Sequence, residues 1–311
     1  MGVKRILVLG GNGFVGKHLI QQLVSHGHKV KILIRSKEET DLIIDVEYVF
    51  NDFSLIDNWD NILHDVDYVC HLISLSTPSS NFEVFDKEIN NNLRATLRLL
   101  QSMNNLGIKK ILFLSSGGSI YGMQNSKSQF DEKSITNPKS FYGLSKLLIE
   151  QLLHFYAENY KFKILILRPS NIYGPGQKTN KPQGVIGHFL NNHLNNRPSE
   201  VWGNGEAKKN YVYVIDLAKI IQKLIKNEVF GTLNIGSGKI TSINEIILII
   251  KDTLNIDLNV KYIQSKEFDV DKVELSNRKL LKSLKDFEFY PLNKGIKDQF
   301  QYLLKNHGSK N

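Results

Sequence analysis

The chain has 311 residues, 41% hydrophobic and 23% charged, a balance that excludes an intrinsically disordered chain and a length that favours about two globular domains. The formal net charge of +9 comes from basic residues scattered among acidic ones, which favours a solvated surface and no nucleic-acid partner, and the absence of any apolar run near ~18 residues predicts no membrane insertion. The single cysteine, Cys70, excludes an intrachain disulfide and a thiolate zinc site, so we expect no metal centre and a reducing, cytoplasmic location.

Strands and helices alternate along the first half of the chain. Short apolar runs predict strands buried on both faces, and apolar residues three and four apart predict the helices between them. The predicted strands span residues 4–9, 29–35, 47–50, 67–73, 110–114 and 163–167, and the predicted helices span residues 14–26, 90–103 and 142–160. This alternation predicts an α/β fold, a doubly wound parallel sheet with helices on both faces.

The pattern changes after Arg168 and Pro169. Residues 170–210 are rich in Asn, Gly and Pro, and the rest of the chain mixes helices with short strands. Helices are predicted at 185–196, 216–226, 243–254 and in a closing stretch, and strands at 211–214 and 259–263. We therefore expect two interleaved domains: residues 1–168 with 211–235, and a smaller C-terminal substrate domain of residues 169–210 and 236–311.

Gly10, Gly13 and Gly16 form a G-x-x-G-x-x-G pattern between the first predicted strand and helix. Glycines let the backbone turn tightly and approach a pyrophosphate closely, and the helix N-terminus supplies amide donors. The pattern predicts the dinucleotide site of a Rossmann-type fold, with a plain strand-to-helix turn as the alternative. The expected cofactor-binding residues at this turn are Gly10, Asn12, Gly13, Phe14, Val15 and Gly16, with Asn12 holding the turn by a hydrogen bond.

The end of the second predicted strand indicates which dinucleotide binds. An acidic residue there would accept hydrogen bonds from the 2′-hydroxyl of NAD, but the strand ends in Arg35. A guanidinium pairs well with a 2′-phosphate, so Arg35 favours NADP over NAD, unless it is simply a surface residue. Asp52, just after the third predicted strand, is expected to accept a hydrogen bond from the adenine amino group or to act as a turn residue.

Tyr142 and Lys146 lie four residues apart and therefore on one face of a helix. A lysine near a phenol stabilises the phenolate and is expected to lower the pKa of Tyr142 toward the working range. Tyr142 then exchanges a proton with a substrate hydroxyl while a hydride moves to or from nicotinamide, and Lys146 also holds the nicotinamide ribose. Two other tyrosine–lysine pairs share this spacing, but one lies in a predicted strand and a proline follows the tyrosine of the other.

These motifs together resemble the extended short-chain dehydrogenase/reductase family, in its nucleotide-sugar epimerase and dehydratase branch, and within it the UDP-hexose 4-epimerases. The resemblance covers nearly the whole chain. It includes residues 9–16, 71–74, Asn92, 114–122, the pair Tyr142 and Lys146, 168–176, 210–216 and 234–238.

The resemblance implies bound NAD or NADP, with Asn92 in the cofactor site. It implies a substrate made of a sugar on a nucleoside diphosphate, usually UDP, whose diphosphate Asn171 contacts. Lys209 and Lys266 stand where the family has two arginines that clamp this diphosphate. Lysine is a point charge without a bidentate fork, so the clamp is looser, and two surface lysines are the alternative.

The resemblance also implies a homodimer formed through the helices around residues 90–103 and 142–160. By analogy with the family, the pathway is polysaccharide biosynthesis. Neither implication follows from composition or spacing.

Gly117 stands where the family carries a catalytic Ser or Thr, four positions before Tyr121. We expect Ser116 or Ser119 to supply the missing hydroxyl, with a water molecule or a loop-capping role for both serines as alternatives. Family dehydratases and decarboxylases carry carboxylates beside this position, whereas this chain has Gly118 and Ser119. Elimination is therefore disfavoured, which leaves reversible oxidation at C4 of the sugar.

These observations favour a 4-epimerase that oxidises C4 of a UDP-hexose or UDP-N-acetylhexosamine transiently with bound NAD or NADP. The runner-up is an NADPH-dependent ketosugar 4-reductase, which Arg35 suits better because a reductase consumes its cofactor. An alternative of another class is a non-catalytic dinucleotide-binding protein, which the missing hydroxyl at Gly117 supports.

Overall fold

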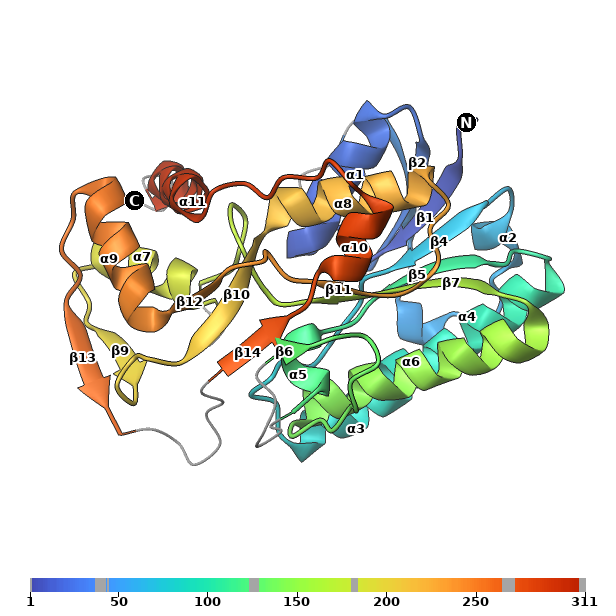
Figure 1. The fold of residues 1–311 in the computed structure, drawn as a ribbon. Helices are drawn as coiled ribbons and strands as arrows, with labels where there is room; N and C mark the ends of the chain where they lie inside the picture. Colours follow the sequence, from blue (N-terminus) through green and yellow to red (C-terminus); the bar gives the residue numbers. More distant parts are fainter. Residues whose placement is uncertain are drawn as a thin grey trace. The chain divides into compact units, whose positions relative to one another are not determined.

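The largest sheet of the protein has seven strands in the order β11-β7-β5-β4-β1-β2-β3, in a computed structural model that describes residues 2–36, 43, 45–122, 129–179, 184–264 and 272–307 (Figure 1). The six strands from β7 to β3 pair in parallel. The strands are β1 Arg5–Leu9, β2 Lys29–Ile34, β3 Val46–Phe50, β4 Tyr68–His71, β5 Lys110–Leu114, β7 Lys163–Pro169 and β11 Gly231–Ile235. The predicted α/β fold with a doubly wound parallel sheet is confirmed.

Helices cover both faces of this sheet. Figure 1 shows α4 and α6 along one face and α1 and α8 along the other. The helices of this part are α1 Phe14–Ser25, α2 Asp60–Leu63, α3 Phe82–Glu88, α4 Arg94–Asn105, α5 Gly117–Ile120, α6 Phe141–Tyr160 and α8 Val214–Lys226, with a 3₁₀ turn η2 at Phe53–Leu55. Helices on both faces explain why the central strands β1, β4 and β5 are mostly apolar rather than alternating.

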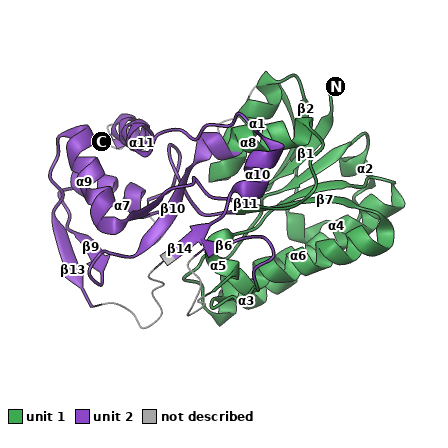
Figure 2. Cartoon of the chain, in the orientation of Figure 1, with its two compact units in different colours: residues 1–122, 135–168, 218–233 green, residues 123–134, 169–217, 234–311 purple. Residues whose placement is uncertain are grey.

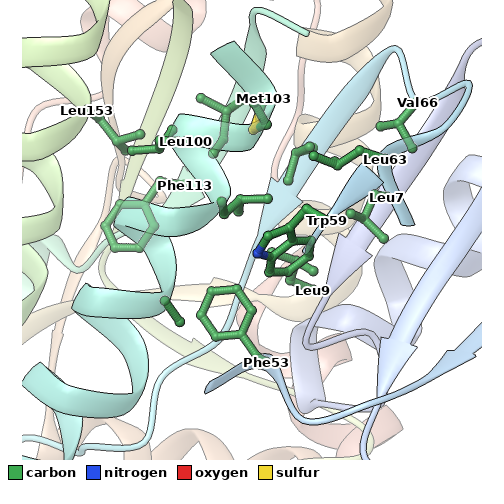
Figure 3. Close-up of a cluster of buried hydrophobic side chains, with 14 of the residues drawn as sticks. Leu7, Leu9, Phe53, Trp59, Leu63, Val66, Leu100, Met103, Phe113 and Leu153 are labelled. Atoms are coloured by element: carbon green, nitrogen blue, oxygen red, sulfur yellow. The ribbon is translucent and has the colours of Figure 1, made fainter. Parts of the chain in front are cut away.

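Apolar side chains from the sheet, α4 and α6 form one buried cluster (Figure 3). Trp59 is completely buried and meets the ring of Phe53 edge-on, with ring centroids 5.7 Å apart. Leu7 from β1 and Met103 from α4 are also completely buried in the cluster. Burial of such side chains contributes about 1.5–3 kcal/mol each, so this cluster fixes α6 against the sheet.

The segment predicted as one helix over residues 90–103 has two parts, a π-helical turn and the helix α4. Between α3 and α4 lies a π-helical turn, η3 Ile89–Leu93, in which the N–H of Arg94 bonds to the carbonyl of Ile89. The Thr96 hydroxyl donates to the Asn92 carbonyl at 2.7 Å, which joins the first turn of α4 to η3. Such π turns occur often at functional sites, and this one carries Asn92.

The second half of the chain forms smaller sheets. In the five-stranded sheet, β10 pairs with β8 and β14 in parallel and with β12 in antiparallel orientation, and β14 also pairs with β6. A two-stranded sheet joins β9 and β13. The strands are β6 Gln129–Phe130, β8 Asn171–Tyr173, β9 Ser199–Trp202, β10 Lys208–Tyr213, β12 Ile240–Ser242, β13 Val260–Ile263 and β14 Lys272–Leu275.

Three helices supply the core of this second part. They are α7 Val185–Leu194, α9 Ile243–Leu254 and α11 Leu292–His307, whose buried residues Phe189, Ile246 and Ile296 pack in one cluster. A short helix, α10, spans Arg278–Ser283. Helix α9 begins at a capping box in which Ser242 accepts from the Glu245 N–H and Glu245 accepts from the Ser242 N–H, so its start is fixed locally.

The chain divides into two compact units (Figure 2). Unit 1 has residues 1–122, 135–168 and 218–233, and unit 2 has residues 123–134, 169–217 and 234–311. The predicted division placed all of 211–235 in the first domain. In the structure residues 129–134, 211–217 and 234–235 group with unit 2. The pairing of β6 with β14, and of β10 with β8, β12 and β14, explains this for the two strands concerned.

Candidate active site

A tight turn joins the end of β1 to the start of α1. Gly10 has a φ of +82°, in the left-handed region that favours glycine, and its carbonyl accepts from the Gly13 N–H at 3.0 Å. A Cβ on Gly16 would lie 2.3 Å from the Gly10 oxygen. The predicted glycines are therefore required for the chain to turn and for α1 to pack against the turn.

The N-terminus of α1 suits an anion. Its N-cap residue is Gly13, which provides no side-chain cap, and the first turn of the helix contains no acidic residue. The amides of the first helical turn, which begins at Phe14 and Val15, thus lack the usual side-chain acceptor. Free amides and the positive end of the helix dipole fit the pyrophosphate of a dinucleotide. Within the described part of the chain, the side chain of Asn12 makes no hydrogen bond, and the turn is closed by backbone alone.

Arg35 and Asp52 follow neighbouring parallel strands at the same edge of the sheet. Arg35 is exposed directly after β2, and the Asn51 N–H bonds to the Ile34 carbonyl at 2.9 Å where β2 and β3 end. Asp52 caps η2, because one carboxylate oxygen accepts from the Ser54 N–H at 2.8 Å and from its hydroxyl at 2.7 Å. Asp52 therefore has a local turn role, which was the alternative interpretation of this residue.

Asn92 is fully buried in η3. Its Nδ2 atom donates to Glu88 Oε1 at 2.6 Å and to the Ile73 carbonyl at 3.3 Å. Ile73 belongs to the loop that follows β4, and a Cβ on Gly10 would lie 3.3 Å from the Ile73 nitrogen. Asn92 thus connects η3 with a loop that packs against the glycine turn.

Tyr142 and Lys146 lie on one face of α6. The helix begins at Phe141 after Ser140, whose hydroxyl accepts from the Gly143 N–H at 3.1 Å, so Tyr142 stands in the first turn. Lys146 is only 2% exposed, and its Nζ atom lies 5.8 Å from the centre of the Tyr142 ring. The same atom donates to the Leu114 carbonyl at 3.0 Å. This bond holds the ammonium group between the end of β5 and the tyrosine.

Burial dominates the ionisation of both residues. It raises the pKa of Tyr142 to about 12, which a hydrogen bond with Ser116 opposes and the charge of Glu88 reinforces. Burial lowers the pKa of Lys146 to about 8, against the opposing charges of Glu88 and Glu150. The sequence predicted that Lys146 lowers the pKa of Tyr142, whereas in this structure desolvation raises it, because the phenolate form loses its hydration.

The sequence left open whether Ser116 or Ser119 supplies the hydroxyl beside Tyr142, and in the structure Ser116 acts on this tyrosine. The Ser116 side chain opposes the rise in the pKa of Tyr142, and its hydroxyl donates to the Ser119 hydroxyl at 3.3 Å. Gly117 is buried, and a Cβ on Gly118 would meet nothing within 4 Å. The structure thus brings Ser116, Tyr142 and Lys146 together. Ser119 contacts Ser116, and the space around Gly118 is open.

The predicted substrate residues fall in unit 2. Asn171 begins β8, is exposed, and donates to the Asn210 carbonyl at 3.2 Å. Lys209 is partly buried in β10, two residues before Tyr211, which pairs with Asn171. Lys266 lies outside the described residues.

Three buried charged residues were not among the predicted site residues. Glu88 is fully buried and accepts from the N–H groups of Leu75 and Ser76 at 2.8 Å each. Glu150 is also fully buried and forms an ion pair with Arg168, with Nη2 and Oε2 2.5 Å apart. The available sequence signal for Glu88 was its position four residues before Asn92, since residues four apart in a helix are neighbours.

The buried ion pair has two further partners. The Ser115 hydroxyl donates to Glu150 Oε1 at 2.5 Å, and Arg168 Nη1 donates to the Tyr121 hydroxyl at 2.9 Å. These bonds link α6 and β7 with Ser115, which follows β5 and directly precedes Ser116. They therefore fix the end of β5 next to Ser116.

In the ranges of the chain that the structure describes, no cluster of three or more His, Cys, Asp or Glu side chains is arranged to hold a metal ion. No helix in these ranges is both long and apolar enough to span a membrane.

Comparisons with known proteins agree with this geometry. Residues 6–236 match the protein family described as the NAD dependent epimerase/dehydratase family. A protein of Methanocaldococcus jannaschii named "Putative UDP-glucose 4-epimerase" is 33% identical over 309 residues, covering 97% of this chain and 99% of that protein. The dTDP-4-dehydro-6-deoxyglucose reductase of Escherichia coli is 32% identical over 267 residues and 82% of each chain.

Among solved structures, the UDP-glucose 4-epimerase of Thermotoga maritima, crystallised with UDP-glucose, superimposes with a TM-score of 0.89. It is 28% identical in sequence, and the match covers 97% of this chain and 99% of that one. The similarity thus extends over both compact units and not only over the glycine turn.

Proposed function

The chain belongs to the NAD dependent epimerase/dehydratase family, and from this premise we propose that it is a nucleotide-sugar 4-epimerase acting on a UDP-hexose or UDP-N-acetylhexosamine. The observation that carries the proposal is the grouping of Tyr142, Lys146 and Ser116 at the end of β5. Relatives of the chain are named as enzymes, which sets aside the alternative of a non-catalytic dinucleotide-binding protein.

In the proposed reaction Tyr142 removes the proton of the sugar C4 hydroxyl. It returns a proton after the oxidised sugar has rotated to present its other face. When bound at the glycine turn, a nicotinamide dinucleotide supplies the hydride chemistry at C4. Lys146 places a positive charge beside the phenol, and the Ser116 side chain favours the phenolate. The interaction with Ser116 opposes the rise in the tyrosine pKa that burial causes.

The absence of carboxylates at positions 118 and 119 argues against elimination of water. Dehydration of a sugar needs a general acid and a general base beside the leaving hydroxyl. Gly118 has no side chain, and Ser119 offers a hydroxyl that bonds to Ser116. Reversible oxidation at C4, which needs a single proton acceptor, is the chemistry that these residues support.

The diphosphate of the substrate is assigned to Asn171 and Lys209, with Lys266 as a third group. An exposed amide at the start of β8 and a cation on the adjacent strand β10 provide a donor and a positive charge for phosphate oxygens. A lysine clamp makes fewer fixed bonds than an arginine clamp, so the nucleotide is expected to bind with a strong dependence on salt.

The experiment that tests the function is an epimerisation assay on the purified protein. Incubation with UDP-glucose or UDP-N-acetylglucosamine is expected to produce the galacto epimer without added reductant, and nuclear magnetic resonance follows the C4 configuration. Failure to interconvert either pair, with NAD and then NADP supplied, would count against the proposal.

A ketosugar 4-reductase remains the second candidate, because the E. coli relative is named as a reductase and Arg35 suits NADP. A reductase consumes one NADPH for each 4-keto sugar, whereas an epimerase shows no net consumption of cofactor. Stoichiometric loss of absorbance at 340 nm with a 4-keto sugar would therefore favour the reductase over the epimerase.

Changing Ser116 to alanine is expected to lower kcat by about 10- to 100-fold, within the range for assistance to a proton transfer. Without this hydrogen bond the pKa of Tyr142 rises, so the midpoint of the pH–rate profile moves to higher pH. Ser119→Ala is the matched comparison, because its hydroxyl touches Ser116 and is expected to have the smaller effect. Equal profiles for the wild type and Ser116→Ala would remove Ser116 from the reaction.

The cofactor preference is tested at Arg35. The family description names NAD, whereas the exposed guanidinium after β2 favours NADP through its 2′-phosphate. Arg35→Ala is expected to weaken NADP binding by about 10- to 100-fold while NAD binding changes little, since a hydrogen bond to a charged group contributes ~1.5–3 kcal/mol. Calorimetric titration of both dinucleotides checks this, and equal losses for the two would contradict it.

A homodimer formed through α4 and α6 and a role in polysaccharide biosynthesis complete the proposal. Leu97 on α4 is 44% exposed and Phe155 on α6 is 52% exposed, which leaves apolar surface on both helices. Light scattering at several concentrations tests the dimer.

A cytoplasmic location is also proposed for the protein, and it is tested by cell fractionation.

A further inference from the structure

We infer that Glu88 is a positioning residue of this site, whose carboxylate ties the loop after β4 to η3 and sets the charge beside Tyr142 and Lys146. The inference rests on the proposed function, because it assigns Glu88 a role in the same proton transfer. It concerns a residue that lies outside the glycine turn and outside the tyrosine–lysine pair.

Three donors converge on this one carboxylate. Oε2 accepts from the N–H groups of Leu75 and Ser76 at 2.8 Å each, and Oε1 accepts from Asn92 Nδ2 at 2.6 Å. Glu88 itself is 0% exposed. An ionised carboxylate is an acceptor only, so the charged form can satisfy all three donors, whereas a protonated form would direct its own O–H toward a donor.

The loop that Glu88 holds packs against both parts of the site. At one end a Cβ on Gly10 would lie 3.3 Å from Ile73, which shows how closely the loop approaches the glycine turn. At the other end the Ser76 hydroxyl lies 3.5 Å from the Ser145 hydroxyl, next to Lys146 on α6. Two backbone hydrogen bonds to Glu88 therefore fix the loop between the glycine turn and the start of α6.

The charge of Glu88 acts on the same two groups. It favours the protonated form of Lys146 and disfavours the phenolate of Tyr142, so it raises the pKa of both. The other charged or titratable groups here are Glu150, which also acts on Lys146, and His71, whose pKa falls to about 3 through burial and the charge of Lys146. Glu150 is paired directly with Arg168, whereas the donors to Glu88 are neutral amides.

Glu88→Gln keeps the shape of the side chain and removes its charge. The variant is expected to lower kcat by at least about tenfold through a loosened loop. It is also expected to move the midpoint of the pH–rate profile to lower pH by about one unit, because loss of a nearby negative charge lowers the pKa of both the phenol and the ammonium group. A purely structural residue would lower kcat and leave the midpoint in place.

Glu88→Asp is the matched control, since it keeps the charge and shortens the side chain. It is expected to lower kcat without moving the midpoint. Glu83→Gln, on the exposed surface of α3, is expected to change neither quantity. A midpoint in Glu88→Gln equal to that of the wild type would overturn the inference, even if activity fell.

A second readout separates this inference from the proposed function. The absorbance of phenolate at 295 nm, measured on protein loaded with NAD and corrected with Tyr142→Phe, reports the ionisation of Tyr142 without turnover. If the wild type interconverts no sugar, the proposed function fails alone and this titration still decides the role of Glu88. If Glu88→Gln does not fold, Glu88→Asn, the uncharged counterpart of Glu88→Asp, is expected to move the midpoint to lower pH relative to Glu88→Asp. An unmoved midpoint there would overturn the inference.

Discussion

Replacing Tyr142 with phenylalanine is expected to lower kcat by about 10²- to 10⁴-fold, the usual contribution of a positioned proton acceptor. The substitution removes one hydroxyl and leaves the ring in the first turn of α6, so the fold and the binding of the dinucleotide are expected to persist. Steady-state assays on the epimer pair measure the loss, and calorimetry with the dinucleotide verifies that binding is retained.

Tyr160→Phe at the other end of α6 is the control for this substitution. Tyr160 is 42% exposed and packs on Tyr156, away from Ser116 and Lys146, so its hydroxyl is expected to contribute nothing to turnover. If Tyr142→Phe retained the activity of Tyr160→Phe, Tyr142 would not be the proton acceptor and the proposed mechanism would be wrong.

Replacing Arg168 with methionine is expected to lower the free energy of unfolding by about 3–5 kcal/mol. The guanidinium pairs with Glu150, which is fully buried, and its removal leaves a carboxylate without a counter-charge in the core. It also removes the donor to the Tyr121 hydroxyl. Urea denaturation followed by circular dichroism measures the change.

Two further variants show whether the unpaired charge causes this loss. The double variant Glu150→Gln with Arg168→Met removes both charges and is expected to recover part of the stability. Arg98→Met breaks an ion pair with Asp57, which is 87% exposed, so it is expected to change stability by about 1 kcal/mol or less. Similar losses for Arg98→Met and Arg168→Met would contradict the assignment of the buried pair.

Several features of the fold and the site were predictable because their signals are local. A strand covered by helices on both faces must be apolar along its length, and β1, β4 and β5 were found from such runs. Tyr142 and Lys146 share a helix face through their spacing alone. Gly16 is required by contacts with residues only five and six positions away, so its pattern is also readable in the sequence.

Short elements and long-range pairs were not predictable in the same way. β6 has two residues and β8 has three, which is too short for a periodic pattern, and each strand exists because of a distant partner. The wide turn η3 likewise appeared in the sequence as ordinary helix. Its hydrogen-bond shift becomes visible only when Glu88 and Asn92 are placed against the loop after β4.

The glycine turn and the tyrosine–lysine pair were predictable because each depends on residues close together in the chain. The fold class and the family were predictable from patterns repeated along nearly the whole chain. The influence of Ser116 on the pKa of Tyr142 could not be predicted in this way, because the two residues come from different elements. The same holds for the burial that raises the tyrosine pKa and for the charges of Glu88 and Glu150 that act on Lys146. Desolvation and charge–charge interactions depend on distances in space, and these distances are set only when the chain folds.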